Sequence, residues 1–295
     1  MDTCTLCPRM CGVNRAAGEK GYCGMDATIR AARAALHMWE EPCISGTRGS
    51  GAVFFSGCSL RCIFCQNFEI AEGNCAKEIS GERLSEIFLE LQEQGAANIN
   101  LVTAAHYVPA VIESLKKAKA QGMDLPVIYN SSGYERVETV QMLEEVVDVW
   151  LPDFKYMDSK LAFAYSRAKD YPEVARAAIR EMMKAAGTCA YDEDGYIQKG
   201  VIVRHLILPG HTKNSIAVLD ELYGTYGDDL TISLMNQYTP LPQVWNIPDL
   251  NRRVTKREYE KVLDHALDLG ITQGFFQEGG TAKESFIPLF DYEGL

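Results

Sequence analysis

Short apolar runs recur along the chain, and polar or glycine-containing segments bound each of them. Six have the length and composition of buried strands: residues 52–56, 98–103, 126–129, 147–151, 201–208 and 230–235. Between them, apolar residues recur three and four positions apart, which predicts helices with one buried face. The clearest such stripes begin at Leu84, Val108, Val174 and Tyr259. This alternation predicts parallel βαβ units.

About six such units favour an α/β fold, a partial (β/α)6 barrel similar to a TIM barrel, because right-handed crossovers place the helices on one outer face. A doubly wound open sheet is the alternative. The first segment is different, since it is rich in Cys, Gly and Arg and lacks clear periodicity. We therefore expect a small Cys-rich metal-binding extension over residues 1–48 and a barrel over residues 49–295.

Composition limits the classes of function. The 295 residues are 47% hydrophobic and 23% charged, as in ordinary globular proteins. A net charge of −11 argues against sequence-independent nucleic-acid binding, which needs a basic face. No signal-peptide core and no apolar run of the roughly 18 residues that span a membrane are visible. We expect a cytoplasmic protein with no nucleic-acid or membrane partner.

Clustered cysteines change this picture. In a reducing cytosol they are metal ligands or redox groups more often than disulfides. Cys58, Cys62 and Cys65 directly follow the first predicted strand with the spacing C-x3-C-x2-C. Three thiolates can bind three irons of a four-iron four-sulfur cluster and leave the fourth iron open to a ligand. Structural zinc is the alternative, although it usually takes four ligands.

A second cysteine set lies near the N-terminus, spaced C-x2-C-x3-C-x11-C: Cys4, Cys7, Cys11 and Cys23. Four thiolates fit tetrahedral zinc and an all-cysteine iron–sulfur cluster equally well, and free or redox-active thiols are the third alternative. The spacing does not choose among them. The remaining cysteines stand alone and are expected to pack as small apolar side chains: Cys43, Cys75 and Cys189.

Polar residues stand at the ends of the other predicted strands, where the functional residues of such barrels lie. These candidates are Thr103, His106, Asn130, Ser131, Asp153, Lys155, Arg204, Gln237 and Tyr238. Each alone has a structural explanation as a turn or helix-capping residue. Their recurrence at five strand ends favours a common site.

The segment GAVFFSGCSLRCIFCQN, with Phe64 before the last cysteine and Gln66 after it, resembles the signature of the radical S-adenosylmethionine (SAM) enzymes. In that superfamily three cysteines hold a 4Fe-4S cluster, and SAM binds its open iron. An electron from the reduced cluster cleaves SAM to a 5′-deoxyadenosyl radical, which abstracts hydrogen from a substrate. The resemblance implies an oxidoreductase that uses both cofactors and an electron donor such as flavodoxin or ferredoxin.

The segments NSSGY, DFK, RHLILPG and LMNQY resemble the activating enzymes of glycyl radical enzymes, most closely the pyruvate formate-lyase-activating-enzyme-like branch. The resemblance implies that Asn130, Ser131, Asp153 and Lys155 approach SAM, with the Lys155 ammonium on its carboxylate. It places Arg204 beside the substrate or SAM, as a catalytic candidate with Lys155.

Two positions depart from that branch. Where the activating enzymes carry Gly-Gly-Glu to hold the SAM amino group, this chain reads TAAH, so Thr103 or His106 would take that role. Where they carry a histidine after the sixth strand, this chain has Tyr238, next to Gln237.

Three functional hypotheses follow. The first is hydrogen abstraction from a glycine of a glycyl radical enzyme, which needs an open groove. The second is the same chemistry on a small molecule or peptide, which needs a pocket of roughly 300 to 1,000 Å³. The third is a non-catalytic iron–sulfur electron-transfer or metal-binding protein.

Overall fold

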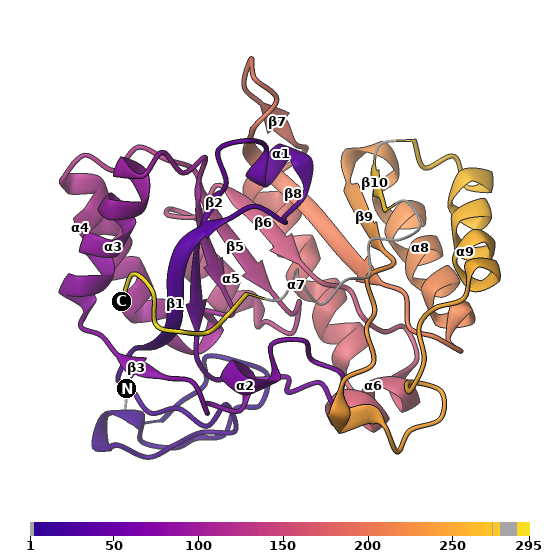
Figure 1. Cartoon of the computed structure of the whole chain (residues 1–295), viewed down its shortest axis with the longest axis horizontal. Coiled ribbons are helices and arrows are strands. Elements are labelled where there is room, and N and C mark those ends of the chain that lie inside the picture. Colours follow the sequence, from indigo (N-terminus) through magenta and orange to yellow (C-terminus); the bar gives the residue numbers. More distant parts are fainter. Residues whose placement is uncertain (1–2, 273, 278–287) are drawn as a thin grey trace.

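Seven parallel strands form the centre of one mixed sheet in the computed structural model, which describes residues 3–272, 274–277 and 288–295 (Figure 1). They are adjacent in the order β2 (Ser50–Phe55), β4 (Ile99–Val102), β5 (Val127–Ser131), β6 (Val149–Pro152), β8 (Ile197–Leu206), β9 (Thr231–Met235) and β10 (Gly274–Phe276). Three antiparallel strands lie at the margins: β1 (Arg30–His37) and β3 (Lys77–Glu78) beyond β2, and β7 (Ala190–Tyr191) on β8.

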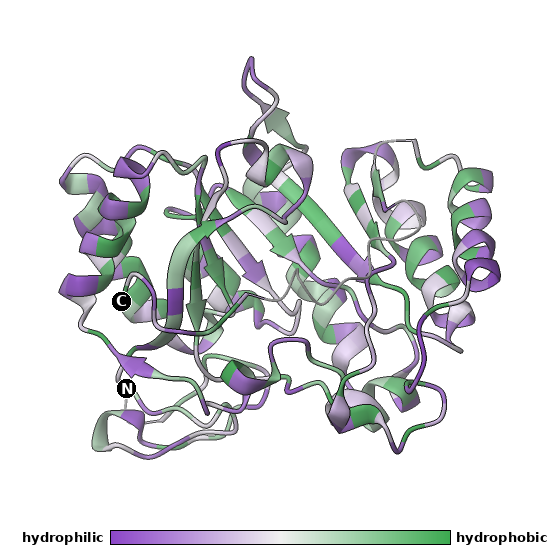
Figure 2. Ribbon diagram, in the orientation of Figure 1, coloured by the Kyte–Doolittle hydropathy of each residue, from purple (hydrophilic) through white to green (hydrophobic). Residues whose placement is uncertain are grey.

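Helices connect successive parallel strands and flank the sheet (Figure 1). They are α3 (Gly81–Glu93), α4 (Val108–Ala120), α5 (Val137–Leu143), α7 (Tyr171–Ala186), α8 (Thr212–Tyr226) and α9 (Lys256–Asp268). Further short elements lie in the loops: α1 (Pro42–Ser45), α2 (Phe68–Ala71), α6 (Ser159–Ser166) and the 3-10 turns η1 (Arg15–Ala17), η2 (Ala105–Tyr107), η3 (Gly227–Asp229) and η4 (Pro242–Val244). The strands consist largely of apolar residues, whereas α3, α4, α8 and α9 carry both polar and apolar residues (Figure 2).

The predicted partial barrel is confirmed, and all six predicted strands are present. The four predicted helical stripes lie in α3, α4, α7 and α9. In α3, for example, the stripe residues Leu84, Ile87, Phe88 and Leu91 are buried. Strand β10 and helix α8 were not predicted from the sequence. The first is only three residues long, and the second carries its buried residues on a narrow stripe that includes Asn214 and Ser215.

Residues 30–45, which the sequence analysis placed in the N-terminal extension, form β1 and α1. Strand β1 pairs antiparallel with β2, and its alanines at positions 31, 32, 34 and 35 are buried. An alanine-rich strand lacks the β-branched residues by which strands are usually recognised. The irregular Cys-rich loops therefore end before Arg30. From there β1 runs antiparallel to β2, toward the end of the barrel where β2 begins.

The described C-terminal residues lie along β1. The backbone N–H of Ala34 donates to the carbonyl of Glu293 at 2.8 Å, and the N–H of Tyr292 donates to Ala32 at 3.0 Å. The described C-terminal residues thus lie on the same side of the barrel as β1 (Figure 1). Within the described ranges, no helix is both long enough and apolar enough to cross a bilayer.

Candidate active site

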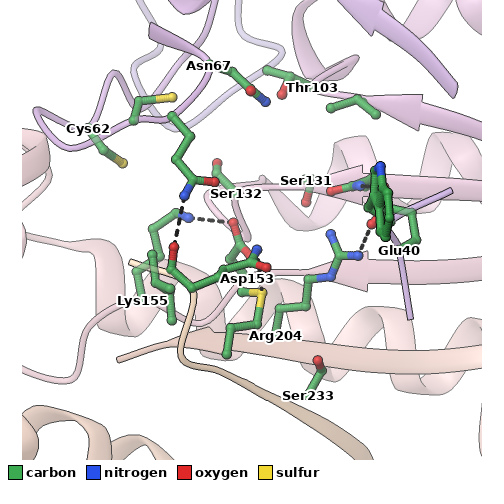
Figure 3. A pocket seen from close by; sticks show the side chains of 18 of the residues that line it. Glu40, Cys62, Asn67, Thr103, Ser131, Ser132, Asp153, Lys155, Arg204 and Ser233 are labelled. Atoms are coloured by element: carbon green, nitrogen blue, oxygen red, sulfur yellow. Dashed lines mark hydrogen bonds and ion pairs between the residues drawn. The ribbon is translucent and has the colours of Figure 1, made fainter. Parts of the chain in front are cut away.

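A cavity of about 690 Å³ opens where the parallel strands end, and most of the predicted site residues line it. These are Cys58, Cys62, Cys65, Thr103, Asn130, Ser131, Asp153, Lys155, Arg204 and Gln237. Cys62 and Lys155 lie on one side of the cavity and Glu40 on the other, with Arg204 between them (Figure 3). His106 and Tyr238 are not among its lining residues.

The three cysteines lie on the loop that follows β2. Gly57 begins this loop by donating its N–H to the carbonyl of Ile70 at 2.7 Å. Phe64 anchors it, because its buried ring packs edge-on between the rings of Tyr156, Tyr165 and Tyr238 at 6.2 to 6.5 Å. Tyr238 also donates its hydroxyl to the carbonyl of Leu250. The aromatic residue before the last cysteine and Tyr238 therefore support the loop by packing.

The thiols of this loop are held in a low-polarity environment. Ser166 donates its hydroxyl to Sγ of Cys62 at 3.1 Å, and the N–H of Leu60 points to Sγ of Cys58 at 3.4 Å. Burial raises the pKa of the Cys62 and Cys65 thiols, and the nearby Lys155 ammonium only partly opposes it. Thiolates at this position therefore need a further positive charge, such as that of a metal cluster.

Lys155 and Asp153 form an ion pair at the end of β6. Nζ of Lys155 lies 2.5 Å from Oδ2 of Asp153, and both side chains are largely buried. Burial alone would lower the pKa of Lys155, but the Asp153 carboxylate and the Cys62 thiol raise it above its usual value. The Tyr171 hydroxyl accepts the N–H of Lys155 at 2.9 Å and lies 2.8 Å from the carbonyl of Ser132. This hydroxyl joins the turns after β5 and β6, so the ammonium is fixed beside the cysteines.

Thr103 and His106, which follow β4, lie in different surroundings. Thr103 lines the cavity in a left-handed backbone conformation (φ 63°), which is strained for a β-branched residue and is typical of functional positions. His106 is buried outside the cavity, with Nε2 at 2.7 Å from the carbonyl of Ser56, and burial lowers its pKa to about 3. Arg15 of the N-terminal loop donates to the His106 carbonyl. His106 thus connects this loop to β2.

Glu40 and Glu41, which the sequence analysis missed, form a charged cluster with Arg204 inside the barrel. Nε and Nη2 of Arg204 donate to the two carboxylate oxygens of Glu41 at 2.8 and 2.5 Å, and Nη2 also donates to Glu40. Oε1 of Glu40 accepts the side-chain amides of Asn100 at 3.0 Å and Asn130 at 3.3 Å. We call Glu40, Glu41 and Arg204 the Glu–Arg cluster. Its only sequence signal is two adjacent carboxylates between Trp39 and Pro42.

Opposite charges stabilise one another within this cluster. Burial opposes ionisation of Glu41, but Arg204 lowers its pKa below the usual value. Burial likewise opposes the charge on Arg204, yet Glu40 and Glu41 raise its pKa. Asn130, predicted to approach SAM, directs its amide to Glu40.

The N-terminal cysteines gather in the loop before β1. Cys4, Cys7 and Cys23 are buried. A Cβ on Gly21 would lie 2.9 Å from Sγ of Cys11 and 3.7 Å from Sγ of Cys23, so these two thiols are near each other. Burial raises the pKa of Cys7 to about 12, and Glu135, Cys23 and Cys4 add to the effect. Across the described residues, neither cysteine set converges on one point as closely as bound metal ligands do.

Arg9 joins this N-terminal loop to the barrel. Its guanidinium donates to the carbonyls of Ser59 at 2.9 Å, Ser166 at 2.8 Å and Arg167 at 2.6 Å. It also lies 4.0 Å from the centre of the Tyr22 ring, a cation–π contact. The loop that carries Cys4 and Cys7 is thereby fixed against the loop that carries Cys58 and Cys62.

Comparison with known proteins identifies the family. Residues 52–222, more than half of the chain, match the family model described as the radical SAM superfamily. The chain belongs to the radical SAM superfamily. It is a radical SAM enzyme, which sets aside the hypothesis of a non-catalytic protein. Within the superfamily, the predicted glycyl-radical branch is not established.

Proteins similar to this radical SAM enzyme are found by sequence and by structure. An uncharacterized protein of Methanocaldococcus jannaschii is 29% identical over 270 residues, which are 89% of this chain and 74% of that protein. HydG, a maturase of the FeFe hydrogenase, superposes with a TM-score of 0.53 at 15% identity, over 80% of this chain and 54% of HydG. Streptococcus suis SuiB bound to S-adenosylmethionine gives a TM-score of 0.49 at 13% identity, over 75% of this chain and 48% of SuiB. The chain thus spans about half the length of these two proteins.

A 4Fe-4S cluster and SAM are the cofactors of this superfamily, and the residues at the cavity fit them. Three thiols line one end of the cavity, and three is the number of thiolates that leaves one iron of the cluster open. When bound, the two cofactors supply electron transfer and the 5′-deoxyadenosyl radical. The chain itself contributes a fixed ammonium at Lys155 and, in the same cavity, polar groups at Thr103 and Ser131.

Proposed function

We propose that this radical SAM enzyme abstracts a hydrogen atom from a small molecule or a short peptide segment that lies between Lys155 and the Glu–Arg cluster. The volume of the cavity supports the proposal. About 690 Å³ lies in the usual range for ligand sites, and here it also has to admit the cofactors. Charged side chains line the end away from the cysteines (Figure 3), so a small polar substrate has partners there that a folded protein surface would not reach.

Within this proposal, Cys58, Cys62 and Cys65 hold the cluster. Thr103, Ser131, Asp153 and Lys155 bind SAM, with the Lys155 ammonium on its carboxylate. Gln237 supports the cysteine loop, since its carbonyl accepts the side-chain amide of Gln66 at 3.1 Å. The electron comes from a low-potential carrier such as flavodoxin or ferredoxin.

Activation of a glycyl radical enzyme, which the sequence motifs favour, stays a prediction. It would require a protein loop to carry its glycine into the same cavity. A gene for a glycyl radical enzyme beside the gene for this chain would support it.

The test begins with anaerobic reconstitution of the cluster and reduction with dithionite in the presence of SAM. We expect 5′-deoxyadenosine to form, and to form faster when a cell extract that passes a 10 kDa filter is added. The retained macromolecular fraction serves as the comparison. No 5′-deoxyadenosine from a fully loaded cluster would overturn the proposed activity, and stimulation by the macromolecular fraction alone would overturn the proposed class of substrate.

A further inference from the structure

The Glu–Arg cluster carries an unbalanced charge inside the barrel. Two carboxylates and one guanidinium leave one formal negative charge, and the side chains of Glu40, Glu41 and Arg204 are only 8%, 6% and 12% exposed. An unbalanced buried charge is costly, and a packing role would be met as well by apolar residues. A charge retained at the wall of a reaction cavity therefore points to a ligand that balances it.

The excess negative charge is located on Glu40. Glu41 is matched by a two-point contact with Arg204, whose Nε and Nη2 each donate to one of its oxygens. Glu40 receives one bond from Arg204 and two from the amides of Asn100 and Asn130. A carboxylate has about four acceptor positions, so Glu40 can accept one more hydrogen bond. Oδ1 of Asn100, buried next to it, has no hydrogen-bond partner among the described residues.

The surroundings favour a cation at this point. Trp39 and Phe54 line the same cavity, and aromatic rings attract ammonium groups. His37 adds no positive charge at neutral pH, because burial lowers its pKa from 6.5. Lys155 is already neutralised by Asp153.

Arg204 offers a hydrogen-bond donor next to the Glu40 carboxylate. Within the described ranges its Nη1 makes no hydrogen bond, and it points from the cluster toward the middle of the cavity (Figure 3). A ligand that places an ammonium on Glu40 can therefore place an acceptor oxygen on Nη1. An amine with a neutral carbonyl on the adjacent carbon meets both groups and balances the single negative charge.

We propose that Glu40 is the specificity-determining residue of the cavity, and that it binds the ammonium of a substrate whose amine is adjacent to a carbonyl, as in an amino-acid amide or a peptide amino terminus. The inference rests on the proposed function, because it assigns the substrate end of the same cavity. Its test is a binding measurement on the protein loaded with cluster and SAM but not reduced.

The probes are four leucine derivatives that differ in whether the amine and the carboxylate are free or blocked: leucinamide, leucine, N-acetyl-leucinamide and N-acetyl-leucine. Affinities are measured by anaerobic titration calorimetry. We expect leucinamide to bind the wild-type protein at least tenfold more tightly than N-acetyl-leucinamide, and N-acetyl-leucine to bind most weakly. Equal affinity for the two amides, tighter binding of N-acetyl-leucine, or no binding of any probe would overturn the proposal.

Glu40→Gln should weaken leucinamide binding at least tenfold and abolish the preference over N-acetyl-leucinamide. The variant should fold, because Arg204 keeps its contact with Glu41, and thermal unfolding checks this. Glu90→Gln is the matched control, since Glu90 also pairs with an arginine but lies on α3 outside the cavity. Unchanged leucinamide affinity in Glu40→Gln would contradict the assignment. If these binding preferences are observed but SAM is not cleaved, the proposed activity is overturned and the assignment of Glu40 is not.

Discussion

Among single residues, Lys155 contributes a positive charge next to Cys62 and Cys65. Its ammonium is held by Asp153 at 2.5 Å and acts electrostatically on Cys62 and Cys65. Lys155→Ala should raise the KM for SAM at least tenfold, because the SAM carboxylate loses a charge-assisted partner. Rates of 5′-deoxyadenosine formation over a range of SAM concentrations measure the effect.

Lys184→Ala is the control for that experiment. Lys184 pairs with Glu181 at 2.8 Å on α7, away from the cavity, so its loss should leave the KM unchanged. An unchanged KM in Lys155→Ala would remove Lys155 from the SAM site.

A second residue-level prediction concerns His205, which is fully buried beside Arg204. One ring nitrogen contacts the carbonyl of Phe154 at 2.7 Å and the other the hydroxyl of Ser215 at 2.9 Å. Burial lowers its pKa from 6.5 to about 4. Between these pH values His205 is protonated in the unfolded chain but not in the folded protein. The free energy of unfolding therefore falls as the pH falls, by up to about 1.4 kcal/mol per pH unit.

His205→Gln should remove this contribution. The pH dependence should become weaker, and what remains comes from other groups. Burial also lowers the pKa of His106, His37 and His211, which adds slopes of the same sign, while the raised pKa of Glu135 acts in the opposite direction. Urea unfolding of the metal-free protein at several pH values from 6.5 to 4 measures it. An equal slope in both proteins would show that His205 does not titrate in this way.

At the level of elements, the turn after β5 is held by a close approach to the segment after β6. Gly133 has φ 71°, and a Cβ there would overlap the carbonyl oxygen of Asp153. Gly195 has φ 84°, but a Cβ there would meet nothing within 4 Å. Gly133→Ala should therefore cost about 3 kcal/mol of unfolding free energy and raise the KM for SAM, whereas Gly195→Ala should cost only about 1 kcal/mol, the backbone penalty. Equal losses in urea unfolding would contradict the steric argument.

The contact between the N-terminal loop and the cysteine loop depends on Arg9. Arg9→Lys keeps the charge but cannot reproduce a guanidinium fork that spans the carbonyls of Ser59, Ser166 and Arg167. We expect a loss of about 2 kcal/mol in unfolding free energy and less iron bound after reconstitution. Arg48→Lys is the control, because Arg48 donates to Gly95 and Ala96 and stacks on Tyr196, away from either cysteine set. Full iron content and stability in Arg9→Lys would contradict this role.

How far the sequence predicts the structure depends on the kind of element. Buried parallel strands and the helices between them have strong periodic patterns, so the barrel and its strand ends could be located from the sequence. Strand β1 could not, because its alanines give little strand signal. Glu40 and Glu41 follow β1 in the chain. Because β1 was not predicted, nothing in the sequence indicated that they reach Arg204, more than 160 positions later.

In the whole molecule, the cavity combines groups from almost the entire chain. Its lining runs from His37 near the start to Pro288 near the end. Sequence motifs located the end that carries the cysteines, which are close together in sequence. At the opposite end, Arg204 could be predicted from its place on a strand, but Glu40 and Glu41 reach it only through folding, so the charged cluster could not be predicted from spacing. The proposed substrate contact at Glu40 therefore lies at the end of the cavity about which the sequence motifs say least.

The N-terminal cysteines are candidates for a second metal site in the protein. Three of the four are buried, and burial raises the pKa of two of them, Cys7 and Cys23, so the thiolates of these two need a nearby cation. Replacing Cys4 and Cys7 by serine should remove one metal while leaving the iron at Cys58, Cys62 and Cys65. Replacing Cys75 and Cys189, which stand apart from both sets, should change neither. Elemental analysis for zinc and iron, with absorption spectra of the reconstituted proteins, tells structural zinc from a second cluster. Identical metal content in the Cys4 and Cys7 variant and the wild-type protein would mean that the loop is held by Arg9 and Arg15 alone.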